Sequence, residues 1–234
     1  MRQEDPGVAL AQSLLIARLP AELRGDCIAA CKVRTYLPGE RICLVGDSTI
    51  GPTWIERGLV KVFGTDGQGV PAAGGLFWGG DTLLASFRSE WTVVATAVAV
   101  TTLCAIRHPE FDRLCDTSAH MSHAWMRLAA EHSRALLRRE AVLRFLALRP
   151  RLLLLLGMAA DSLGTPLPEG ILLDFPLTHA TLSCSTWVSR DETGRALRDL
   201  EQQGYLLSRP RHRILIPDRE CLNHDQHLRS EDAD

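Results

Sequence analysis

The middle of the chain, from about residue 109 to about residue 162, carries an apolar pattern with the period of a long helix. Within this segment, one row of positions is spaced alternately four and three residues apart, which is the heptad spacing of helices that pair with one another. This row consists of Met121, Trp125, Leu128, His132, Ala135, Arg139, Val142 and Leu146. A second apolar row runs beside it and consists of Ala129, Leu136 and Leu143.

Two adjacent apolar rows on one helix need two partners, because each row has to be covered. The simplest partners are a second copy of the chain, across a twofold axis, and the chain's own preceding domain. The predicted dimer interface comprises Met121, Trp125, Leu128, His132, Ala135, Val142 and Leu146. Because Pro150 interrupts the pattern, we expect a hinge near residues 147–150 and a new helix with proline in its first turn.

The first half of the chain has a different character. Residues 1–35 predict a helical lead-in, in which Cys27 and Cys31 lie one helical turn apart. From residue 36 to residue 107, short apolar runs separated by Gly, Pro and Asp-Gly pairs predict an antiparallel β-sandwich or β-roll. The β-branched and alanine-rich residues 93–106 predict a strand at the end of this region.

Composition and charge fit a globular protein that gathers its positive charge locally. The 234 residues suffice for two modest domains, and the formal net charge is −2. Residues 208–213 nevertheless hold three arginines and no acid. The longest apolar run, residues 152–160, is too short to span a bilayer and predicts a buried helix. No secretory signal is evident and the seven cysteines are scattered, so we expect a cytoplasmic protein with reduced thiols.

Residues 171–217 predict a strand, two short helices and a hairpin, after a loop at residues 164–170. Thr178 is placed to cap the first helix. Ser189 and the glutamate three residues later fit a capping box at the start of the second helix. Gly204 suits the position just beyond its end.

This arrangement is that of a winged helix-turn-helix, whose second helix enters the major groove of DNA. Arg190 can donate two hydrogen bonds to a guanine, Asp191 can accept one from a cytosine amino group, and Arg195 faces the same groove. The residues of the first helix start and of the basic wing are placed to contact phosphates. The predicted DNA-contacting residues are Thr178, His179, Ser189, Arg190, Asp191, Arg195, Arg209, Arg211 and Arg213.

The stretch from residue 177 to residue 201 resembles, without a gap, the helix-turn-helix of the Crp/Fnr superfamily. Asp191 stands where that family usually has a glutamate, one methylene longer. Residues 36–40 and 54–62 resemble the characteristic strands of the family's β-roll, and the resemblance covers roughly residues 20–218.

The resemblance implies an α+β fold with an N-terminal antiparallel β-roll of the cyclic-nucleotide-binding type, a long dimerisation helix and a C-terminal winged helix-turn-helix. The expected boundaries are residues 1–115 for the roll with its lead-in, 116–148 for the dimerisation helix and 149–234 for the DNA-binding domain. The implied partners are double-stranded DNA carrying an inverted repeat, a second copy of the chain, RNA polymerase and a small-molecule effector. No membrane and no enzyme activity are expected.

The family's cyclic-nucleotide site does not carry over to this sequence. The segment after Gly80 lacks the Gly-Glu-Leu turn, and the two helix positions that meet the base hold leucines without a hydroxyl group. We therefore expect that cyclic AMP does not bind well and leave the effector unknown, although Arg88 remains able to receive a phosphate anion. The candidate effector-pocket residues are Asp81, Arg88, Ser89, Trp91, Leu136 and Leu137.

Two further kinds of site stay open as alternatives. A haem held by His or Cys ligands would make a gas sensor, and four histidines cluster around the long helix: His108, His120, His123 and His132. Cys27 with Cys31 is a weak match to an iron–sulfur site, and Cys104 with Cys115 to a redox pair, whereas buried packing is favoured for all four thiols. No metal site is predicted. The alternative function is a haem-binding or small-molecule-binding sensor module without specific DNA binding.

Overall fold

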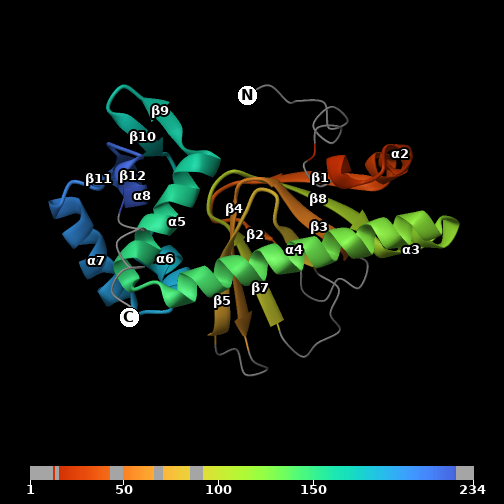
Figure 1. Ribbon diagram of the computed structural model, residues 1–234, viewed down its shortest axis with the longest axis horizontal. Coiled ribbons are helices and arrows are strands. Elements are labelled where there is room, and N and C mark those ends of the chain that lie inside the picture. The colour runs from red at the N-terminus through yellow and green to blue at the C-terminus, as the bar shows by residue number, and fades with distance from the viewer. Residues whose placement is uncertain (1–12, 14–15, 43–49, 66–70, 85–91, 225–234) are drawn as a thin grey trace. The chain divides into compact units, whose positions relative to one another are not determined.

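The computed structural model describes residues 13, 16–42, 50–65, 71–84 and 92–224 (Figure 1). These residues fall into two compact units, one comprising the residues up to 73 together with 77–138, and the other comprising 74–76 with the residues from 139 onward. Among the described residues, no helix combines the length and the apolar character that a membrane crossing needs.

The first unit is built on two four-stranded sheets with the strand orders β1-β8-β3-β6 and β2-β7-β4-β5. The described strand pairs within them are antiparallel. Its strands are β1 (Cys31–Tyr36), β2 (Arg41–Ile42), β3 (Ile50–Arg57), β4 (Leu59–Thr65), β5 (Pro71–Trp78), β6 (Thr82–Leu84), β7 (Thr92–Ala97) and β8 (Thr101–Arg107). Its helices are η1 (Ile16–Arg18), α2 (Ala21–Ala30), α3 (His108–Thr117) and most of α4 (Ala119–Phe145). The predicted β-roll with a helical lead-in and a long following helix is therefore confirmed.

Two local predictions in this unit need correction. The single strand expected at residues 93–106 is in fact β7 and β8, which turn at residues 98–100 and join different sheets. The sequence conceals this turn because residues 93–106 are rich in β-branched residues and contain neither glycine nor proline. Cys31 lies outside the lead-in helix. It is the first residue of β1 and pairs with Ile106 of β8.

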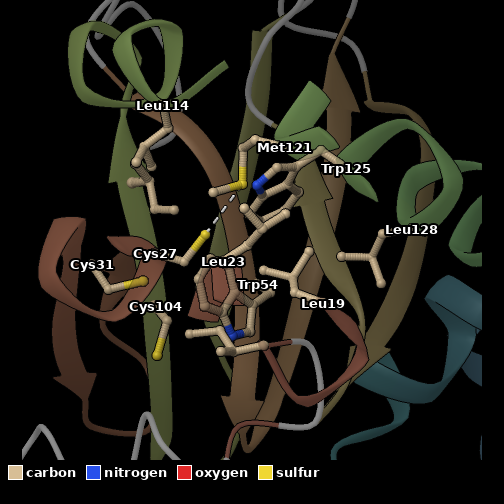
Figure 2. Close-up of a cluster of buried hydrophobic side chains, with 12 residues drawn as sticks. Leu19, Leu23, Cys27, Cys31, Trp54, Cys104, Leu114, Met121, Trp125 and Leu128 are labelled. Carbon is tan, nitrogen blue, oxygen red and sulfur yellow. Dashed lines mark hydrogen bonds between the residues drawn. The ribbon is translucent and has the colours of Figure 1, made fainter. Parts of the chain in front are cut away.

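One face of α4 is buried in the core of its own unit (Figure 2). Met121, Trp125 and Leu128 are at most 7% exposed and pack with side chains of η1, α2, α3 and the first sheet. The ring centroid of Trp125 lies 6.2 Å from that of Trp54 on β3, and 5.3 Å from that of Phe111 on α3 in an edge-to-face arrangement. Such aromatic pairs stabilise the core beyond the area that they bury.

The predicted dimer interface is therefore wrong in its first half, because Met121, Trp125, Leu128 and His132 are already covered by their own chain. Of the other predicted interface residues, Ala135 and Val142 are exposed and Leu146 is half-buried. The row with the clearest heptad spacing thus faces the protein's own core over its first half. The apolar side chains on the opposite side of α4 remain uncovered.

The cysteines of this core are buried thiols. Burial raises the pKa of Cys27 to about 11 and that of Cys104 to about 12, and it also raises the pKa of Cys31. The Cys27 thiol lies 3.6 Å from the sulfur of Met121. Since the thiolate is the reactive form of cysteine, burial and the raised pKa values indicate a packing role for these three side chains.

The second unit contains the end of α4, the helix α5 (Leu148–Leu163) and a four-stranded sheet of order β11-β12-β10-β9. Its remaining elements are β9 (Thr165–Leu167), β10 (Gly170–Leu173), α6 (His179–Thr186), α7 (Arg190–Gln202), β11 (Leu207–Arg209), η2 (Pro210–His212), β12 (Arg213–Ile216) and α8 (Cys221–His224). Pro150 lies in the first turn of α5, as predicted, and the break from α4 falls at residues 146–147. The expected loop at 164–170 instead contains β9, which pairs with β10.

The capping box predicted at the start of α7 is confirmed. The Ser189 hydroxyl accepts a hydrogen bond from the Glu192 backbone N–H at 3.2 Å, and a Glu192 carboxylate oxygen accepts one from the Ser189 N–H at 3.0 Å. Hydrogen bonds from the side chain and then the backbone of Ser189 lower the pKa of Glu192. At its other end the helix gives way to Gly204 in the left-handed region (φ 81°), as the sequence predicts.

Thiol labelling tests the burial of the cysteines. Of the described cysteines, Cys221 alone is exposed, so native protein should react quickly there and slowly at Cys27, Cys31 and Cys104. A hydrogen bond to Asp218 raises the pKa of Cys221, so its labelling rate should increase with pH above neutrality. Mass analysis of labelled peptides with and without denaturant checks this, with Cys221→Ser as the control. Fast native labelling of Cys27 or Cys104 would contradict the buried assignment.

The variant Ser189→Ala tests the capping box. It should lower the free energy of unfolding by about 1 kcal/mol, the usual contribution of a helix N-cap. Because the pKa of Glu192 is depressed in the folded state, the box is complete above the unfolded pKa of a glutamate and weakens as pH falls through the folded one. Urea unfolding as a function of pH should therefore show a shallower acid decline for the variant. Ser162→Ala, an exposed change inside α5, is the control and should leave stability nearly unchanged.

Candidate nucleic-acid interface

The two helices of the motif are joined by a turn in which Trp187 adopts the left-handed conformation (φ 53°). Thr178 caps the first of them, α6, by accepting a hydrogen bond from the backbone N–H of Thr181 at 3.1 Å, as predicted. The buried residues Thr186 and Thr193 face each other between the helices, with their hydroxyl oxygens 3.4 Å apart. The turn and this contact set the angle between α6 and α7.

The outer face of α7 carries basic side chains. Arg190, Asp191 and Arg195, the three predicted base-reading residues, are all exposed, while Leu197 and Leu200 are buried on the inner face. No ion pair to either arginine is recorded among the described residues. The face is thus chemically free to meet the edges of bases.

A close approach joins the start of α6 to α7. A Cβ atom at Gly194 would lie 2.7 Å from Nδ1 of His179, so only glycine lets the imidazole lie against the helix in this position. His179 was predicted as a phosphate contact from its place near a helix N-terminus. The structure adds that its ring packs on Gly194, and the signal for this contact is a glycine inside an otherwise regular helix.

The three arginines of the basic wing differ in exposure and in their contacts. Arg209 and Arg211 are exposed. Arg213 is half-buried, forms an ion pair with Asp174 at 3.0 Å and also donates a hydrogen bond to the carbonyl of Pro210. Arg213 therefore braces the hairpin, whereas the other two present free charge.

The tip of the wing is conformationally costly. Arg211 and His212 both have positive φ, 63° and 57°, which gives the tip two consecutive residues in the left-handed region. Side chains other than glycine, asparagine and aspartate rarely adopt this backbone, at a cost of about 1–2 kcal/mol for each residue.

A hollow between α7 and the wing is lined by basic groups, including Arg198, which the sequence reasoning missed. Arg198 is exposed and lies three residues after Arg195, on the same side of the helix; that spacing was the available signal. Glu201 fixes the wall of the hollow by accepting hydrogen bonds from the backbone N–H and the hydroxyl of Ser208. The hollow therefore combines a rigid frame with several cationic side chains.

Three of the six candidate effector residues, Asp81, Leu136 and Leu137, belong to the described part of the chain. Asp81 is buried and accepts a hydrogen bond from the backbone N–H of Trp78, which closes the turn between β5 and β6. Leu136 is half-buried and Leu137 is 69% exposed, so the two leucines do not share one environment. Arg88, Ser89 and Trp91 lie outside the described residues.

One histidine of the predicted cluster is engaged in the fold. His132 is buried, and its Nε2 accepts a hydrogen bond from the backbone N–H of Thr82 at 3.0 Å, which links α4 to the start of β6. Among the residues that the structure describes, no group of three or more His, Cys, Asp or Glu side chains is arranged to hold a metal ion.

Comparison with known proteins agrees with this architecture. Residues 151–224 match the family model of the Crp-like helix-turn-helix domain. No curated protein sequence matches the chain. Several solved structures share its fold.

One of these structures is a CRP-family transcriptional regulator of Thermus thermophilus (20% identity, TM-score 0.62, 82% of this chain and 96% of that one). Another is a CooA mutant from Carboxydothermus hydrogenoformans (18% identity, TM-score 0.59, 86% and 90%). A third is a proposed cyclic-nucleotide-binding protein of Ruegeria pomeroyi (19% identity, TM-score 0.68, 97% and 99%). The resemblance inferred from the sequence is thereby confirmed: the chain has the fold of the Crp/Fnr regulators and ends in a Crp-like helix-turn-helix domain.

Proposed function

We propose that this protein is a transcription regulator that binds a specific inverted repeat in double-stranded DNA as a homodimer. The observation that carries the proposal is the exposed basic face of α7, held by a capping box at its start and flanked by a basic wing. Helix-turn-helix domains of this shape insert the second helix into the major groove with its N-terminal residues at the base edges. The Thermus thermophilus protein with the same fold is a transcriptional regulator, which supports this assignment.

Within this proposal the exposed arginines have two kinds of role. Arg190 and Arg195, near the start of α7, read bases together with Asp191. Arg198, farther along the helix, and Arg209 and Arg211 on the wing contact phosphates and supply the charge that drives non-specific attraction. Thr178 and His179 add contacts at the start of α6, where backbone N–H groups also face an anion.

The proposed dimer contact lies on the face of α4 opposite the buried one. The exposed residues of this face follow a near-heptad spacing and are Met126, Ala130, Ser133, Leu137 and Ala141. Met126 and Leu137 are 65% and 69% exposed, and Phe145 near the end of the helix is 91% exposed. On a 27-residue helix, such a row can pack against the same row of a second copy. The resulting twofold dimer would present two recognition helices, one for each half-site of an inverted repeat.

The proposed partners also include RNA polymerase and a controlling small molecule other than cyclic AMP. Leu136 and Leu137 offer no hydroxyl group to a purine base, and this lack supports the exclusion of cyclic AMP. An effector acts by favouring one orientation of the paired recognition helices over another.

DNA binding by arginine variants tests the proposed roles. On a site selected from a random duplex pool, Arg190→Ala should weaken binding by about 1–3 kcal/mol and relax preference at one base pair. Arg198→Ala should weaken binding to all sequences alike and reduce the slope of log affinity against log salt by about 1. Fluorescence anisotropy over a salt series measures both, and Arg113→Ala on α3 is the charge-matched control. If no duplex is preferred by the natural protein, sequence-specific recognition is ruled out.

The oligomeric state of α4 variants tests the dimer. Leu137→Glu should convert the dimer to a monomer, because it puts a charge into an apolar contact row. Arg138→Glu is the matched control, since the next residue of a helix points about 100° away from that row. Sedimentation velocity at several concentrations checks both variants. A monomeric natural protein, or a fully dimeric Leu137→Glu variant, would contradict this interface.

A further inference from the structure

The recognition helix α7 is held near both ends by arginines from the first turn of α5. Arg149 lies over the ring of Tyr205, just after α7, with its Cζ 5.0 Å from the ring centroid. Arg151 lies over the ring of Trp187, just before α7, with its Cζ 5.4 Å from the centroid. Since only Pro150 separates the two arginines, one rigid helical turn contacts the segments on both sides of α7.

Arg151 also connects the end of α4 with the end of α6. Its guanidinium group donates one hydrogen bond to the carbonyl of Thr186, at the end of α6, and another to the carbonyl of Leu146, just after α4. Burial, with a further contribution from the nearby charge of Arg144, lowers the pKa of Arg151. The side chain therefore bridges the α4–α5 junction and the helix-turn-helix turn at a partly desolvated position.

Trp187 receives a second cation, from α4 itself. The Cζ atom of Arg144 lies 4.7 Å from the centroid of the Trp187 ring. The backbone of Trp187 is strained, because a bulky residue rarely adopts a positive φ, whereas glycine would adopt it without strain. Two guanidinium groups over one ring give a physical reason for tryptophan at this position.

We propose that Trp187 is a positioning residue, which couples the last turn of α4 and the first turn of α5 to the recognition helix through Arg144 and Arg151. This inference rests on the proposed function, because it concerns how α7 is aimed at DNA. With the contacts in place, a rotation of the α4 end carries the start of α7 with it. Without them, α7 samples orientations that do not fit both half-sites, and apparent affinity falls with the competent fraction.

The decisive variant is Trp187→Gly, which removes the ring and relieves the backbone strain together. Measured well below its thermal midpoint, its affinity for the selected inverted repeat should fall about tenfold, the factor that two weak cation–π contacts together produce. Affinity for random-sequence duplex and the salt slope should not change, because no DNA-contacting group is lost. A tryptophan that served in packing alone would leave the specific affinity of the folded protein unchanged.

Arg144→Gln provides an independent variant, because Arg144 is exposed and its loss does not threaten folding. It should weaken specific binding about threefold in the natural background and have no effect in the Trp187→Gly background, which is the sign of one shared contact. Arg134→Gln, another exposed arginine of α4, is the matched control and should be neutral in both backgrounds.

The outcomes separate this inference from the proposed function. Failure of the natural protein to prefer any duplex would end the proposed function. Normal specific binding by the natural protein together with equal binding by Trp187→Gly, or additive effects of Arg144→Gln and Trp187→Gly, would overturn the coupling alone.

Discussion

Much of this structure depends on the burial of one face of α4 against the β-unit that precedes it. Trp125 packs against Trp54 and Phe111, so the helix is fixed to its own sheet before any other molecule is involved. The hydrogen bond from the backbone N–H of Thr82 to His132 adds a polar link farther along the same face. The first half of α4 is thus fixed by contacts within its own unit.

The second unit is organised around a comparable constraint at α7. A capping box begins the helix, Gly204 follows its end, and residues on both sides of it contact α5. The outward arginines then project from a helix whose position is fixed by contacts that do not involve them. Such a division leaves the basic face available for the proposed contact with DNA.

Features with a local cause could be predicted from the sequence. The capping box, the N-cap at Thr178 and the proline in the first turn of α5 each depend on residues within one helical turn, so pattern alone identified them. Turn residues and a change of period indicated a β-sandwich or β-roll followed by a long helix, while the resemblance to the Crp/Fnr superfamily implied the roll in particular. The turn between β7 and β8 was missed because it contains neither glycine nor proline.

Features that depend on distant residues could not be predicted in this way. The row from Met121 to His132 has good heptad spacing, yet spacing cannot tell whether an apolar row faces a second chain or the same one. The ion pair of Arg213 with Asp174 and the contacts of Trp187 with Arg144 and Arg151 join residues brought together only by the fold. Arg198 is different, because its helical spacing from Arg195 was visible in the sequence.

The left-handed backbone of Arg211 and His212 has a consequence for how this domain can change over time. An Asn-Gly pair would suit that hairpin better, so substitutions that make the isolated domain more heat-resistant are readily available at the wing tip. Replacing Arg211 would also remove a cation from the surface proposed to contact DNA. Under the proposed function, backbone comfort and DNA affinity therefore make opposite demands on the residue at position 211.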